Sequence, residues 1–95
     1  MTAKDHRATL VRVIGRVQGV GFRYWTRDEA RRLGLRGWVR NERDGSVAAL
    51  LAGPEAAVAA MLELLWRGPE GAAVSGVVPE PASSDGTPRD FSIAR

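Results

Sequence analysis

The segment GRVQGVGFR, residues 15–23, has the composition of a binding site, because it places three glycines directly before an arginine. It follows a β-branched stretch and precedes one with helical periodicity, so we expect a loop between a strand and a helix. The first turn of a helix exposes unpaired N–H groups and the positive end of the helix dipole, which attract anions. Gly19 and Gly21 can adopt positive φ, which lets successive amides point to one centre. The pattern therefore predicts a cradle for a phosphate group.

Arg23 falls in the first turn of the expected helix, from which its side chain can reach the same centre. A guanidinium donates two parallel hydrogen bonds to a phosphoryl group, which a lysine cannot do. An ordinary glycine-rich turn followed by a surface arginine explains the spacing equally well, because short glycine patterns often match by chance. The glycines follow neither the dinucleotide-binding pattern G-x-G-x-x-G nor the P-loop pattern.

Asn41 is the second polar candidate, because it shares the phase of Val39 in the next extended stretch. That phase directs its side chain to the face of the sheet that helices are expected to cover. A side-chain amide there can accept one hydrogen bond from a water molecule and donate another, and so orient it. The alternative is a turn-forming asparagine ahead of Asp44-Gly45, and the residue alone favours that alternative.

Other catalytic groups are scarce. The chain has no cysteine, which excludes disulfides, thiolate nucleophiles and cysteine-ligated metals. Its single histidine, His6, falls in a polar stretch over residues 1–7, which we expect to be a flexible tail. No group of His, Asp and Glu has the spacing of a metal site, so we expect no metal. Catalysis would therefore depend on hydrogen-bond donors and on positioning.

Charge is uneven along the 95 residues. Residues 1–43 carry eleven Lys/Arg and four Asp/Glu, whereas residues 44–95 carry three and seven. A basic half suggests an anionic partner, although a solvated helix face accounts for most of these arginines. No apolar run reaches the roughly 20 residues of a membrane span, and the N-terminus lacks the apolar stretch of a secretory signal. We therefore expect a cytoplasmic protein that does not bind membranes.

The remaining periodicity predicts the elements that position these residues. We expect helices at 22–34 and from Gly53-Pro54-Glu55 to Gly68-Pro69, and strands at 8–15, 35–43, 46–53, 72–81 and 91–95. The prolines of the fourth strand favour a place at an edge of the sheet. The order β-α-β-β-α-β predicts one α+β domain over residues 8–95, a ferredoxin-like sandwich of an antiparallel sheet with two helices on one face. A fold of this kind does not by itself define a function.

These residues resemble the acylphosphatase family. The run GRVQGVGFR carries most of the resemblance, and more residues follow at the same spacing: Thr26, Ala30, Leu33-Gly34-Leu35, Gly37-Trp38-Val39, Asn41, Asp44-Gly45-Ser46-Val47, Gly68-Pro69, Ala73-Val74, Phe91 and Ile93. The likeness covers about residues 8–95 and is most specific in the first half. Two departures are Ala48, where an acidic residue is frequent, and Ala94-Arg95 at the end, where some members carry an aromatic residue.

The resemblance implies hydrolysis of the carboxyl–phosphate anhydride of small acyl phosphates, with inorganic phosphate as a product and no cofactor. It implies that Arg23 binds the phosphoryl oxygens together with six backbone amides, those of Val17, Gln18, Gly19, Val20, Gly21 and Phe22. It implies that Asn41 positions the attacking water. We also expect a monomer, because no long apolar surface stripe is left unassigned.

Two other functions remain open on the sequence alone. The same cradle could bind phosphate or an acyl phosphate without hydrolysing it. An RNA-recognition motif shares the order of elements, but it stacks bases on aromatic residues of its central strands. The strand expected at 46–53 has no aromatic residue, and Trp38 alone makes no platform, so we expect no nucleic-acid partner.

Overall fold

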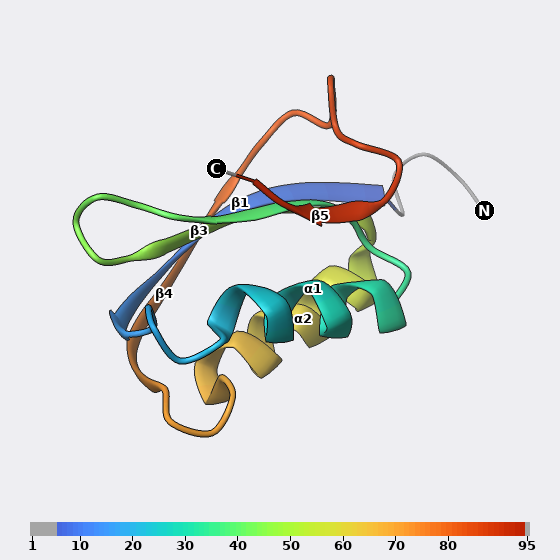
Figure 1. The fold of residues 1–95 in the computed structure, drawn as a ribbon. Helices are drawn as coiled ribbons and strands as arrows, with labels where there is room; N and C mark the ends of the chain where they lie inside the picture. Colours follow the sequence, from blue (N-terminus) through green and yellow to red (C-terminus); the bar gives the residue numbers. More distant parts are fainter. Residues whose placement is uncertain (1–5, 95) are drawn as a thin grey trace.

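The computed structural model describes residues 6–94, which form a five-stranded sheet with two helices on one face (Figure 1). The elements are, in chain order, β1 (His6–Arg16), α1 (Phe22–Arg32), β2 (Arg36–Asn41), β3 (Val47–Pro54), α2 (Glu55–Arg67), β4 (Ala73–Pro81) and β5 (Phe91–Ile93). Each boundary lies within two residues of the predicted one, and the predicted ferredoxin-like order is confirmed. Neither helix of these described residues is long and apolar enough to cross a membrane.

The strands lie side by side in the order β4-β1-β3-β2-β5. The first three neighbouring pairs are antiparallel, as predicted, but β5 pairs with β2 in parallel, with Gly37 opposite Phe91. Residues 82–90 connect β4 at one edge of the sheet to β5 at the other edge. This segment crosses from one edge of the sheet to the other on the side away from the helices (Figure 1).

The core lies between the sheet and the two helices. Alternate residues of the strands face it, as the period of two in a strand requires. The buried residues of this cluster come from every strand except β4, from both helices and from the loops on either side of α1: Val11, Val13, Val17, Phe22, Ala30, Leu35, Val39, Val47, Ala49, Leu51, Val58, Met61, Leu65 and Phe91. The central strand β3, which pairs with β1 and β2, is buried on both faces.

The first strand begins at His6, so the last two residues of the stretch expected to be a tail belong to the sheet. His6 lies opposite Pro54 and Arg7 lies opposite Gly53. The end of β3 offers these residues backbone partners, and that pairing outweighs their polar composition. Residues 1–5 of the expected tail lie outside the described residues.

The strand β4 lies at one edge of the sheet and pairs with β1 alone, as its prolines predicted. Pro79 lies opposite Val11, and Pro81 lies opposite Thr9.

The short strand β5 depends on one buried side chain. Phe91 is 0% exposed, and its carbonyl oxygen accepts a 3.0 Å hydrogen bond from Nε of Arg31 on α1. Phe91→Ala should lower the free energy of unfolding by about 3–5 kcal/mol, because it leaves a large cavity in the core. Urea unfolding followed by circular dichroism measures this, with the exposed Ser92→Ala as the matched control on the same strand. Equal midpoints for the two variants would contradict the placement of β5.

Candidate functional site

Residues 17–21, the glycine loop, join β1 to α1. Their backbone conformation requires glycine at two positions. Gly19 has a φ of 76° and Gly21 a φ of 78°, both in the left-handed region. A Cβ atom added at either position would meet nothing within 4 Å, so crowding does not explain the glycines. The backbone conformation does, because it is unfavourable for residues that carry a side chain. Val17 and Val20 fix the loop to the domain by packing in and against the core.

The backbone amides of the glycine loop and of the first turn of α1 are free donors. Among residues 6–94, no backbone carbonyl accepts a hydrogen bond from the amides of residues 18–24. Gly21 is the N-cap of α1 and supplies no side-chain bond, and the first turn contains no acidic residue. Helix N-termini usually satisfy such donors with a capping side chain or water. The joint between β1 and α1 therefore offers a run of N–H groups and the positive end of a helix dipole to an anion.

Arg23 lies in the first turn of α1 and is partly exposed. Within the part of the chain that the structure describes, its guanidinium has no carboxylate partner. Five other arginines each form an ion pair with a carboxylate: Arg12, Arg27, Arg31, Arg32 and Arg40. Arg23 therefore leaves its donors available next to the free amides.

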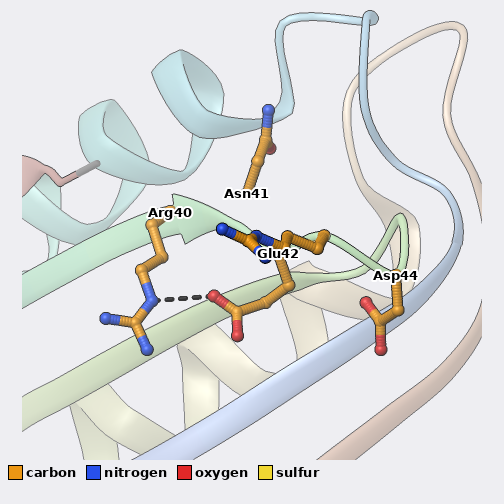
Figure 2. A pocket seen from close by; sticks show the side chains of 5 residues that line it. Arg40, Asn41, Glu42 and Asp44 are labelled. Atoms are coloured by element: carbon orange, nitrogen blue, oxygen red, sulfur yellow. Dashed lines mark hydrogen bonds and ion pairs between the residues drawn. The ribbon is translucent and has the colours of Figure 1, made fainter.

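Asn41 ends β2, and its side chain points to the side of the sheet on which α1 lies, as its phase predicted (Figure 2). Its neighbours Arg40 and Glu42 point to the opposite face. In residues 6–94, two buried side-chain polar atoms have no hydrogen-bond partner, namely Thr26 Oγ1 and Asn41 Oδ1. Leaving a buried acceptor unpaired costs about 1–3 kcal/mol, and such groups often belong to functional sites.

The register of β3 places Asn41 and the glycine loop at the same end of the sheet. Val47 of β3 lies opposite Val13 of β1 on one side and opposite Asn41 of β2 on the other. Neighbouring strands lie about 4.8 Å apart, so Asn41 is about 10 Å across the sheet from Val13, three residues before β1 ends at Arg16. The two predicted parts of the site are thus brought to one region by a strand that contributes no side chain to it.

The side chain of Gln18 connects the glycine loop to the turn that follows Asn41. Its Nε2 atom donates one hydrogen bond to the carbonyl of Glu42, at 2.8 Å, and another to the carbonyl of Ser46, at 2.9 Å. Sequence reasoning assigned only the backbone amide of Gln18 to the site and missed this contact. Both acceptors are more than twenty residues away, and no local pattern identifies them.

The turn between β2 and β3 is held by Asp44, which confirms the predicted Asp44-Gly45 turn. Its carboxylate accepts hydrogen bonds from the hydroxyl of Ser46 at 2.6 Å and from the amide of Ser46 at 2.9 Å. These two bonds, with a weaker attraction from Arg12 at 3.7 Å, lower the pKa of the exposed Asp44 carboxyl below its usual value.

A shallow hollow of about 460 Å³ lies at this turn, lined by Arg40, Asn41, Glu42, Arg43 and Asp44 (Figure 2). Arg40 and Glu42 form a 2.7 Å ion pair there. The Asn41 side chain points to the other face, and the two carboxylates that line the hollow repel anions. The glycine loop is therefore a better site for a phosphate group than this hollow. Among residues 6–94, no three His, Cys, Asp or Glu side chains are grouped as in a metal site.

The described residues thus form a ferredoxin-like α+β domain with free amides at a strand–helix joint, an unpaired arginine and a buried amide oxygen. The family model for acylphosphatase matches residues 9–93 of this sequence. The chain therefore belongs to the acylphosphatase family, as the sequence motifs predicted, and is an enzyme of that type.

Individual relatives agree with this assignment. An acylphosphatase of Rhizobium meliloti (strain 1021) is 63% identical over 92 residues, which are 97% of each chain. A solved acylphosphatase of Coxiella burnetii has a TM-score of 0.91 and 38% identity, covering 99% of this chain and 100% of its own. The acylphosphatase of Bacillus subtilis has a TM-score of 0.88 and 38% identity, covering 93% and 98%. The similarity extends over the whole domain in each case.

Ser46→Ala removes the donor that contributes most to the low pKa of Asp44, so that pKa should rise toward its usual value of about 3.9. A carboxyl with a depressed pKa stabilises the fold above its unfolded pKa, and this support is lost as pH falls through the folded pKa. The wild type should therefore lose its stability advantage over the variant in that acidic range. Titration of the Asp44 carboxyl carbon by NMR measures the shift, with Ser75→Ala as a remote serine control. An unchanged Asp44 pKa in Ser46→Ala would contradict this explanation.

Proposed function

We propose that this enzyme hydrolyses small acyl phosphates by attack of water on phosphorus, with Arg23 and Asn41 as its catalytic side chains. The unpaired, buried Oδ1 of Asn41, at the same end of the sheet as a run of free amides, is the observation that carries the proposal. In the reaction the water oxygen bonds to phosphorus, and the bond from phosphorus to the acyl oxygen breaks. The electron pair of that bond leaves with the carboxylate, and inorganic phosphate is the second product.

The phosphoryl oxygens would bind in the cradle formed by the amides of residues 17–22 and by Arg23. In the transition state, the transferring phosphoryl group carries its charge on three oxygens. Catalysis therefore depends mainly on positioning and on donors that already point at these oxygens. The left-handed conformation of Gly19 and Gly21 holds the amides in place before substrate arrives. Arg23 adds two donors in one plane and a full positive charge.

Asn41 would hold the attacking water through its Oδ1 atom, which needs a donor in any case. A carboxylate is a weak base, so its departure needs no general acid. A phosphoryl oxygen can accept the proton of the water, so no side-chain base is needed either. His6 cannot serve as one, because it begins β1 and the glycine loop follows the other end of that strand, roughly 33 Å away.

The proposed reaction needs no metal ion. The positive groups that a metal would supply are already provided by Arg23, by the free amides and by the dipole of α1. Hydrolysis should therefore be unchanged when EDTA is present.

Two alternatives lead to different measurements. A binding module would take up phosphate saturably but release none from an acyl phosphate. Nucleic-acid binding would need exposed aromatic rings on the sheet, and the ring of Trp38 is stacked under the Arg40 guanidinium at 4.6 Å. The function that we propose is acyl phosphate hydrolysis. We also propose that the enzyme is a monomer in solution, and size-exclusion chromatography tests this by measuring its apparent size.

Arg23→Ala should raise KM and lower kcat, with a loss in kcat/KM of about 10²–10³-fold, because it removes donors to the phosphoryl group in both states. Phosphate release from benzoyl phosphate in the presence of EDTA measures this. Arg32→Ala is the matched control, since Arg32 lies in the last turn of the same helix and pairs with Glu29. A folded Arg23→Ala enzyme with normal kcat/KM would refute the assigned role.

Asn41→Ala should lower kcat by about 10²–10³-fold and leave KM and the inhibition constant of phosphate nearly unchanged, because Asn41 contacts the water rather than the phosphoryl group. The same assay separates kcat from KM, and circular dichroism checks that the variant is folded. Normal turnover by the folded variant would remove Asn41 from the mechanism.

A further inference from the structure

We propose that Gln18 is a positioning residue, whose side chain fixes Asn41 relative to the phosphate-binding loop. This inference rests on the proposed function and adds a third side chain to it. The two hydrogen bonds from Gln18 Nε2 to the turn between β2 and β3 carry the argument.

Both acceptors belong to the hydrogen bonds that close this turn. The carbonyl of Glu42 also accepts the amide of Gly45, at 3.2 Å, and the carbonyl of Ser46 also accepts the amide of Glu42, at 2.8 Å. Gln18 adds a second donor to each carbonyl and joins the two with a single NH₂ group. The glycine loop and the turn are thereby held as one unit.

The anchored turn begins one residue after Asn41. Within residues 6–94, β2 ends at Asn41 and the ladder with β3 ends at the pair formed by Asn41 and Val47. The carbonyl of Glu42 is the next backbone group that contacts the phosphate-binding loop. A displacement of about 1 Å in a catalytic group can lower a rate 10²-fold, so this contact has a large effect on the reaction.

Gln18 cannot act on the substrate through the same NH₂ group. A primary amide has two N–H donors, and both are directed at backbone carbonyls. These donors therefore hold the turn rather than the substrate, and their effect on rate should depend on Asn41 being present.

The test uses Gln18→Met, which keeps the length of the side chain and removes both donors. We expect kcat for benzoyl phosphate to fall by about 10–100-fold, with a smaller change in KM, because the water and the phosphoryl group are no longer aligned. In an Asn41→Ala background the same substitution should lower kcat by less than about twofold, since coupled residues are not additive. An equal loss in both backgrounds would overturn the proposal. Gln18→Leu, which also removes both donors and adds no charge, replaces it if the methionine variant does not fold.

Asp44→Ala is the matched control, because it weakens the same turn without touching the donors of Gln18 or the two carbonyls. Its kcat should stay within about twofold of the wild type at a comparable loss of stability in urea. If Asp44→Ala lowers kcat as much as Gln18→Met, a loosened turn explains both and Gln18 has no positioning role.

The outcomes also separate this inference from the proposed function. An inactive wild type, or an active Asn41→Ala variant, would overturn the proposed function. An active wild type and an inactive Asn41→Ala variant, together with a fully active Gln18→Met variant, would overturn the role of Gln18 alone.

Discussion

The candidate site depends on the backbone between β1 and α1, where the chain turns from a strand into a helix and, among residues 6–94, no backbone carbonyl accepts a hydrogen bond from the amides of residues 18–24. Gly19 and Gly21 make this turn possible, because both hold a positive φ that other residues adopt at a cost. The turn also sets the direction in which the α1 dipole points. A positively charged arginine in the first turn is repelled by the positive end of the helix dipole. Its position becomes favourable once an anion lies between the guanidinium and the free N–H groups.

The sheet supplies the second requirement, a fixed distance between this turn and Asn41. The two lie on strands that are not neighbours, so their relation is set by β3, which pairs with both. A shift of β3 by one residue would turn its apolar side chains from one face to the other. Because β3 is buried on both faces, the packing of its side chains opposes such a shift and so protects the geometry of the site.

Much of this could be predicted from the sequence, since local patterns set the elements. The switch from a period of two to a helical period marked both ends of the glycine loop, and the phase of Asn41 gave the face of its side chain. Three features were not predictable locally: the parallel pairing of β5, the entry of His6 into β1 and the contacts of Gln18. Each depends on which distant segment lies alongside, and that is decided by packing of the whole chain.

The prolines of β4 have a consequence for the behaviour of the protein at high concentration. A proline fits a strand where its missing N–H faces away from the partner strand, and Pro79 and Pro81 share one phase on an edge strand. The outer side of β4 therefore lacks two of the donors that a second copy would need to extend the sheet. Edge-to-edge association, the usual first step of strand-mediated aggregation, is disfavoured at this edge.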